Sequence, residues 1–284
     1  MKNFLSKIKT ERVYVFLILL FGMISVFVTF PLGNGDEGYH LSKSYNIFSM
    51  NHPKSMKKTV VRQLEYQAIG LDGDMKDFDV ETFYIKKLKD VEKDSFRFNI
   101  AYDRNITMQI DIAHIPAAIG VMVGRVIYPS YGIMLLCSRI SSLLFFALCM
   151  GAIIKKSTVG KWTLFMLFSI PCIQKLASPS YDVFSYVVFA MYSVNIFELA
   201  KLRTIKEVSK QKILYTLITI ILLLFCKKNY LFALAVIPFL PMFFLRVLEW
   251  LDNKKMSVKI VIFVTGIIVM LVLLGGLNYY LNLL

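Results

Sequence analysis

The chain has 284 residues, of which 57% are hydrophobic, and its mean hydropathy is +0.60. This composition excludes an ordinary soluble domain and is typical of a polytopic membrane protein. The net charge of +14 would suit a nucleic-acid partner, but the basic residues gather in short segments between apolar runs. That distribution is typical of cytoplasmic loops, so we expect membrane lipid and not nucleic acid as the partner.

A basic N-terminal segment precedes the first apolar run. Lys2, Lys7, Lys9 and Arg12 lead into residues 13–31, which are almost wholly apolar. This run is longer than the core of a cleaved signal peptide, and no small-residue cleavage site follows it. The pattern predicts a retained first membrane span with the N-terminus in the cytoplasm.

The polar segment 32–111 comes next and is predicted to be the first extracytoplasmic loop. It contains 12 Lys and Arg against 13 Asp and Glu, so it is nearly neutral. Asp36 follows the turn signal at residues 33–35 and is expected to cap a helix. We expect two amphipathic helices that lie on the outer leaflet. Their apolar sides carry Tyr39, Ile47 and Phe48 in the first, and Phe83, Tyr84, Leu88 and Val91 in the second.

Eight apolar runs are candidates for crossings, each of which needs about 20 residues. If all eight crossed the membrane, 12 Lys and Arg of the short loops would lie outside, against the positive-inside rule. If 112–128 lies in the interface instead, the same residues face the cytoplasm. The pattern therefore favours seven crossings plus one interfacial helix. The eight runs are 13–31, 112–128, 133–154, 162–178, 183–200, 213–226, 229–245 and 258–281.

This topology predicts an all-α polytopic fold in one integral membrane domain, residues 1–284. It also places three polar segments on the same external face: the loop with Asp36, the turn before Asp182, and the pair Lys227-Lys228. With eight crossings, Asp36 and Asp182 would be separated by the bilayer. Only the topology with seven crossings permits one shared site.

The segment Asp36-Glu37-Gly38-Tyr39-His40 directly follows the first span. Ionisable groups at the edge of a bilayer are costly and indicate function. Asp36 and Glu37 would suit a general base, whereas the simpler interpretation is a helix cap with an acidic first turn. His40 lies four residues after Asp36, so both could hold a divalent cation such as Mg²⁺ or Mn²⁺. A solvated or packed histidine is the alternative for His40.

Four further residues are candidates for substrate binding or catalysis. Asp182 stands at the outer mouth of two predicted spans, where the alternative is a helix cap. Lys228, beside Lys227, would suit a phosphate, unless the pair only snorkels to the interface. Arg139 lies inside a predicted span and needs a partner or a water-filled cavity. His114 begins the interfacial helix and is expected to line the same cleft.

Other polar features predict no site. The acidic residues between 72 and 79 lack the spacing of an EF-hand, so a solvated loop is expected. The sequon at Asn105 is a pattern only. The four cysteines lie in apolar runs without paired spacing, which predicts inert thiols.

Five short segments in chain order carry a resemblance to known proteins: Pro31…Asp36-Glu37…His40, Ile115–Gly120…Gly124-Arg125, Arg139-Ile140-Ser141, Pro171…Gln174–Ser178…Ser180–Asp182 and Lys228-Asn229-Tyr230. Together they resemble a bacterial family of integral membrane proteins known as domain of unknown function 2142. The resemblance extends over most of the chain. The family is similar in turn to the GT-C glycosyltransferases, multispanning enzymes that use polyprenyl-phosphate sugars.

The resemblance implies an enzyme that moves a sugar from a polyprenyl-phosphate donor to a cell-envelope glycopolymer on the extracytoplasmic face. Asp36 would deprotonate the acceptor hydroxyl or organise a metal, with Asp182 as the second acidic residue. Lys228, with Arg139, would hold the lipid phosphate. GT-C relatives continue through further spans, so the resemblance implies a fold shortened at the C-terminus. Two alternatives stay open: a flippase or transporter of lipid-linked sugars, and a degenerate accessory protein.

Overall fold

The computed structural model describes residues 9–70, 79–100, 108–158, 160–176, 178–252, 256, 260–261 and 264–265, and the described residues form helices and connections without a strand. The chain divides into two compact units. The first unit is Met1–Glu198 with Ser209–Ala235, and the second is Leu199–Val208 with Val236–Leu284. The N-terminal lysines 2 and 7, the acidic positions 72–77 and Asn105 lie outside the described residues.

The helices follow one another along the chain with short connections. The longer apolar helices are α2 (Thr10–Val28), α8 (Ile115–Ile127), α9 (Tyr131–Lys156), α10 (Lys161–Leu176), α11 (Asp182–Leu199) and α12 (Lys210–Leu224). The polar loop contains α3 (Glu37–Ile47), η1 (Lys54–Met56), α4 (Lys58–Ile69), α5 (Val80–Ile85), α6 (Lys89–Glu92) and α7 (Met108–Ala113). The remaining elements are η3 (Ile205–Glu207), η4 (Lys228–Phe239) and α13 (Pro241–Asp252).

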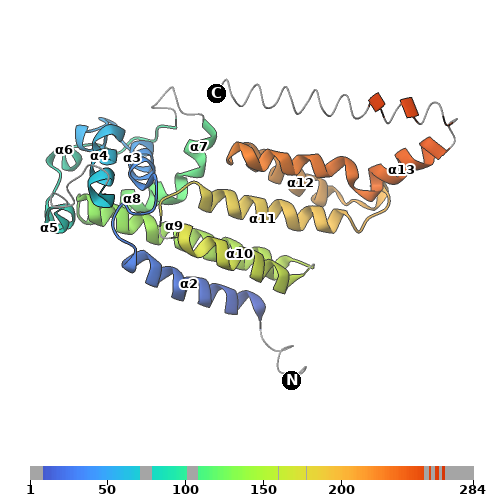
Figure 1. Ribbon diagram of the computed structural model, residues 1–284, viewed down its shortest axis with the longest axis horizontal. Helices are drawn as coiled ribbons and strands as arrows, with labels where there is room; N and C mark the ends of the chain where they lie inside the picture. The colour runs from blue at the N-terminus through green and yellow to red at the C-terminus, as the bar shows by residue number, and fades with distance from the viewer. Residues whose placement is uncertain are drawn as a thin grey trace. The chain divides into compact units, whose positions relative to one another are not determined.

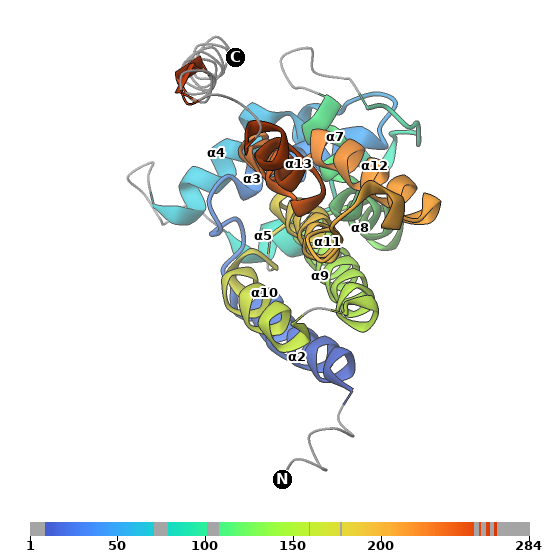
Figure 2. The same ribbon diagram turned by 90° about the vertical axis from the view of Figure 1, so that its right-hand side faces the viewer.

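One apolar core joins the long helices α2, α9, α10 and α11, which lie side by side in Figure 1 and are viewed nearly end-on in Figure 2. Gly22 of α2 faces Leu143 of α9, and Gly151 of α9 faces Val15 of α2, so these two helices are antiparallel. The Tyr14 hydroxyl donates to the Phe168 carbonyl across the α2–α10 contact. Small residues thus let α2 and α9 pack closely, as in many membrane helix pairs.

Consecutive long helices of the first unit alternate in direction. Thr158 follows α9 and bonds to Glu198 near the end of α11, and Lys212 at the start of α12 pairs with the same Glu198. At the opposite end, Lys175 at the end of α10 pairs with Asp182 at the start of α11. We call this second end, where α2 ends and α9 begins, the site end.

The structure supports part of the expected span count. Within the described residues, α2, α9 and α11 are long and apolar enough to cross a membrane, whereas α10 and α12 have 16 and 15 residues. The run 229–245 is not one continuous α-helix, because η4 ends at Phe239 and α13 begins at Pro241, and a crossing there stays a prediction. Pro238 and Pro241 lack the backbone N–H that a continuous helix needs. Most of the run 258–281 lies outside the described residues.

Helix α8 corresponds to the predicted interfacial run. It has 13 residues, about 20 Å by helical rise, and it lies antiparallel to α9. A Cβ on Gly120 would collide with the backbone at Cys137 and Ser138, and one on Gly124 would come within 2.8 Å of the Met134 Cα. The two glycines therefore bring the helix backbones into contact. That α8 does not cross the membrane stays a prediction.

The polar loop folds over a second core at the site end. This core is formed by side chains from α3 to α6 together with α8 and α9. Nine of the eleven residues of α3 are buried, so α3 does not lie on the surface as an amphipathic helix. The expected second amphipathic helix is also two short ones, α5 and α6, because residues 86–88 leave the helical conformation.

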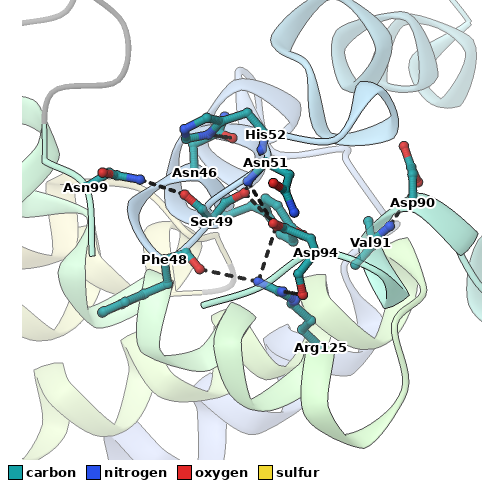
Figure 3. Close-up of polar contacts among 11 residues, drawn as sticks. Asn46, Phe48, Ser49, Asn51, His52, Asp90, Val91, Asp94, Asn99 and Arg125 are labelled. Atoms are coloured by element: carbon teal, nitrogen blue, oxygen red, sulfur yellow. Dashed lines mark hydrogen bonds and ion pairs between the residues drawn. The ribbon is translucent and has the colours of Figure 1, made fainter. Parts of the chain in front are cut away.

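Buried ion pairs fasten this loop to the helices. Lys43 of α3 pairs with Asp111 of α7, and Asp94 pairs with Arg125 of α8 at 3.5 Å. Asp94 also accepts hydrogen bonds from the Tyr45 and Ser49 hydroxyls (2.7 and 2.6 Å), so the loop backbone near 48–52 is held against α8 (Figure 3). Burial requires such pairing, since an unpaired charge there would be very costly.

Candidate functional site

A cavity of about 300 Å³ opens at the site end of the first unit. It is lined by Ser25 and Thr29 near the end of α2, by Asn34 and Gly35 of the following turn, and by Lys175 at the end of α10. Asp36 follows Gly35 in the chain, and Lys175 pairs with Asp182 at 3.6 Å. Asp36 is therefore adjacent in the chain to one residue of the cavity wall, and Asp182 is the ion-pair partner of another.

Asp36 occupies the cap position of α3 without capping it. Its φ of 58° is left-handed, a conformation that Asp and Asn tolerate better than most residues, and its side chain makes no cap hydrogen bond. The carboxylate instead pairs with Arg62 of α4 and is 64% exposed. The predicted capping role is therefore wrong, and the Asp36 carboxylate is available at the surface beside the cavity.

Glu65 of α4, and not Asp36, binds a backbone N–H at the start of α3. Its carboxylate accepts the Gly38 N–H at 3.1 Å, one of the backbone donors that a helix start leaves unpaired. Burial raises the pKa of Glu65, and the Gly38 hydrogen bond opposes that shift. Sequence reasoning missed Glu65, because it lies 27 residues from its partner and only the packing of α4 on α3 brings them together.

Glu37 and Arg139 form a buried ion pair. Arg139 donates from Nε and Nη2 to the two Glu37 carboxylate oxygens at 2.8 and 2.7 Å, and both side chains are at most 1% exposed. Burial raises the pKa of Glu37, and Arg139 opposes that shift. Arg139 also donates to three carbonyls at the end of α2, those of Val26, Thr29 and Phe30. All five bonds are internal, so the pair fixes the turn that carries Asp36.

His40 and His114 form a buried pair. His40 Nδ1 lies 2.8 Å from His114 Nε2, and the residues are 6% and 0% exposed. The Tyr181 ring stands edge-on to both imidazoles, at centroid distances of 5.0 and 5.5 Å. Tyr39 flanks His40 at 5.2 Å. The structure thus joins two histidines that the sequence separates by 74 positions.

Positive side chains surround this histidine pair. Burial lowers the pKa of His40 well below its ordinary value, and His114, Lys175, Arg62 and Lys227 add to that effect in this order. His40 is therefore neutral at pH 7. A neutral imidazole within a positively charged surrounding is suited to meet an anion.

The remaining predicted residues lie around the same site. Asp182 is the first residue of α11, and the Ser180 hydroxyl accepts its N–H at 3.1 Å, so Ser180 and not Asp182 caps this helix. Lys227 lies over the Tyr181 ring at 5.8 Å. Lys228, the lysine chosen from the sequence, is half-buried at the start of η4. The structure thus places Lys227, the neighbour of the predicted lysine, against the Tyr181 ring.

A divalent cation at Asp36 and His40 is not favoured by their surroundings. The Asp36 carboxylate forms an ion pair with Arg62, and His40 Nδ1 is hydrogen-bonded to His114. The positive charges near His40 would also repel a further cation. In the described part of the chain, no group of three or more His, Cys, Asp or Glu is arranged to hold a metal ion. A divalent cation at these residues stays a prediction, which their present partners oppose.

Apolar helices of alternating direction with a polar site at one end define an all-helical membrane protein. The chain belongs to the family described as predicted membrane protein DUF2142, which matches residues 19–277. Comparison with the curated proteins and with the solved structures found no match.

Proposed function

We propose that the chain transfers a sugar from a polyprenyl-phosphate donor to a cell-envelope acceptor at the cavity of the site end, on the extracytoplasmic face. The observation that supports this proposal most is the position of Asp36. It presents an exposed carboxylate beside a cavity of about 300 Å³ whose wall includes Lys175, the partner of Asp182. The substrate class comes only from the resemblance of the sequence segments to GT-C enzymes and is part of the proposal.

The proposed reaction is a displacement at the anomeric carbon of the sugar. Asp36 takes the proton of the acceptor hydroxyl, the acceptor oxygen bonds to the anomeric carbon, and the bond from that carbon to the phosphate oxygen breaks. The phosphate leaves with the bonding electron pair. Lys175 and Arg62 then stabilise the negative charge that develops on it.

Asp36→Asn tests the proposal. Asn tolerates the left-handed backbone at this position, so the protein should fold, while the base is lost. Transfer of a labelled sugar from a polyprenyl-phosphate donor in membranes should fall by about 10²–10⁴-fold. Asp79→Asn, which removes another exposed carboxylate of the same loop, is the matched control and should retain full transfer. Full transfer by the Asp36 variant would remove it from the mechanism.

A second candidate is a transporter of lipid-linked sugars. The positive side chains near His40 favour it equally, since they can hold a lipid phosphate without chemistry. Purified protein in liposomes would then move a labelled lipid-linked sugar across the bilayer and form no new glycosidic bond. Formation of a glycosidic product that depends on Asp36 would favour the transferase over the transporter.

A further inference from the structure

We infer that one side of α8, together with the loop segment beside the end of this helix, binds acidic phospholipids of the leaflet at the site end. Helix α8 then stands upright beside α9 within that leaflet and does not lie flat in the interface. The inference is independent of the proposed sugar transfer. We call this side the α8 surface, and it consists of Ile119, Val123, Val126 and Ile127 of α8 with Phe96 and Phe98 of the loop.

The exposed side of α8 is wholly apolar. The one charged residue of this helix, Arg125, is buried, and Gly120 and Gly124 pack the opposite side against α9. The exposed residues recur at spacings of three and four, so they share one side of the helix. An apolar side of this kind is unfavourable in water and marks a surface that meets lipid or another protein. The exposed residues are Ile119, Val123, Val126 and Ile127, at 44–70%.

The position of α8 on α9 favours lipid as the partner. Helix α8 packs on the α9 backbone at Cys137, and the Ser141 hydroxyl donates to the Pro116 carbonyl at 2.7 Å. The same side of α9 continues at spacings of three and four to Leu144 and Leu148, the first large exposed residues of that helix. Because α9 is long and apolar enough to cross a membrane, these leucines are expected to face lipid. Helix α8 covers the continuation of this lipid-facing side, so its own outer side faces lipid in turn.

The length of α8 fits a single leaflet. Its start lies beside Ser141, near the middle of the 26-residue α9, and its end lies beside the start of α9. A helix of about 20 Å covers one leaflet of a hydrocarbon core that is about 30 Å thick. The polar residues before α8 are paired inside the protein, Asp111 with Lys43 and His114 with His40. The start of α8 can therefore lie at this depth without exposing a charge to lipid.

The loop segment 85–98 is attached to the end of α8. The Tyr128 hydroxyl donates to the Ile85 carbonyl at 2.6 Å, and the Arg125 guanidinium lies 4.0 Å from the centre of the Phe96 ring. Both phenylalanines of the α8 surface are more than half exposed. The apolar side of α8 thus continues onto the loop.

Basic residues outnumber acidic ones in this segment. Residues 85–98 contain five Lys and Arg, all exposed, against three Asp and Glu, and Arg125 raises the excess to +3. One of the acids, Asp94, is buried in its pair with Arg125. The neighbouring α5 and η1 contribute Glu81 and Lys54, which leave the excess unchanged. Exposed aromatic and basic residues together are typical of segments that bind anionic membranes. The five basic residues are Lys86, Lys87, Lys89, Lys93 and Arg97.

A cavity of about 230 Å³ lies between this segment and the last turn of α8. Its wall includes Val126 and Ile127 of the α8 surface and also Lys87. Lys87 forms an exposed ion pair with Glu92 at 3.8 Å, and such pairs contribute little free energy. Lys87 can therefore exchange Glu92 for a lipid phosphate. An acidic phospholipid matches both parts, because its headgroup suits the cavity and its acyl chain suits the apolar side of α8.

Spin labels test the contact with lipid. The full chain without its native cysteines, in liposomes of phosphatidylcholine and phosphatidylglycerol, carries one label at Val123→Cys. The label should collide often with oxygen, which dissolves among acyl chains, and rarely with a water-soluble nickel chelate, as should a label at Leu148→Cys of α9. Val60→Cys is the matched control, because Val60 of α4 is also an exposed valine, at 37% against 44% for Val123, and its label should show the reverse.

Brominated lipids test the headgroup. Phe96→Trp, in a chain whose two native tryptophans are replaced by Phe, reports contact because bromine quenches indole fluorescence. Brominated phosphatidylglycerol should quench at a lower mole fraction than brominated phosphatidylcholine. Lys87→Gln should weaken this preference by about fivefold, which corresponds to about 1 kcal/mol for one basic residue at an acidic surface. Lys155→Gln, in the last turn of α9, should leave the preference unchanged.

The outcomes separate lipid from the other partners. Free access of the nickel chelate to position 123 overturns the inference, and so does protection from both reagents, which would show spin–spin broadening if a second copy of the chain covers the α8 surface. Equal quenching by the two lipids, or an unchanged preference in Lys87→Gln, overturns the choice of acidic phospholipid. If Val123→Cys or Phe96→Trp fails to fold, Val126→Cys and Phe98→Trp take their places. None of these measurements involves Asp36, so the inference and the proposed sugar transfer can fail separately.

Discussion

At the scale of single residues, buried charges of the polar loop determine its position. Asp94 shows this best, because four groups converge on its carboxylate. One is the Tyr45 hydroxyl. The other three, drawn in Figure 3, are the Ser49 hydroxyl, the Asn51 N–H and the Arg125 guanidinium. Burial raises the pKa of Asp94, but these contacts outweigh it, and the pKa lies below its ordinary value. The ionised form is therefore the one that stabilises the fold.

Asp94→Asn should lower the free energy of unfolding at pH 7 by about 2–3 kcal/mol, because bonds to a charged acceptor are lost. A lowered pKa gives stability that is present above pH 4 and lost as the pH falls through the folded-state pKa, so the difference from wild type should shrink at pH 3. Unfolding in detergent at both pH values measures this. Glu92→Gln, in an exposed pair at 3.8 Å, should change stability by under about 0.5 kcal/mol.

The Glu37–Arg139 pair gives a second prediction at this scale. Glu37→Gln or Arg139→Met alone leaves a buried polar group without its partner and should cost about 3–5 kcal/mol of unfolding free energy. The double variant should cost clearly less than the sum of the two, as measured by thermal unfolding in detergent. Additive losses would show that the two side chains do not depend on each other.

At the scale of elements, the sequence predicts where a helix begins and ends better than it predicts which residues pack around that helix. The bounds of α2, α9 and α11 lie close to the predicted runs, because long apolar stretches have few alternatives. Helix α3 could not be predicted as buried, since its polar residues are satisfied by partners far away in the chain. Glu37 binds Arg139, 102 residues further on, and the Ser42 hydroxyl donates to the Met56 carbonyl.

The contact between α8 and α9 predicts the effect of a single methyl group. Gly120→Ala would press a Cβ into the α9 backbone, within 2.6 Å of the Ser138 Cα, and backbone cannot move aside cheaply. We expect a loss of about 1–3 kcal/mol in unfolding free energy. Val123→Ala, on the exposed side of the same helix, should change stability by about 0.5 kcal/mol or less, and equal effects of both variants would contradict the contact.

At the scale of the whole molecule, the charge pattern predicted the alternation of the helices. The assumption that 112–128 does not cross put the turns near Asp36, Asp182 and Lys227 on one side, and the first unit brings these turns together. The sequence did not reveal the histidine pair, because a contact over 74 positions depends on how α3 meets the start of α8. The sequence also did not indicate that Arg139 would donate five hydrogen bonds to acceptors inside the protein.

Labelling of intact cells tests the orientation. Asp36→Cys and Asp182→Cys, each in a chain without its native cysteines, should react with an impermeant maleimide from outside, whereas Thr158→Cys should not. Thr158 contacts Glu198, which lies about 24 Å along α11 from Asp182. Thr158 is therefore at the opposite end of the helices from the site end. Labelling at position 158 with protection at position 36 would reverse the orientation and end the proposal of an extracytoplasmic site.

The five hydrogen bonds of Arg139 have a consequence for the evolution of the family. A lysine has three donors and no planar fork, so it could not serve both Glu37 oxygens and three helix-end carbonyls. A replacement at position 37 or 139 alone would leave the other side chain buried without its partner. Among relatives, these two positions should therefore covary, with intermediates that carry only one replacement being rare.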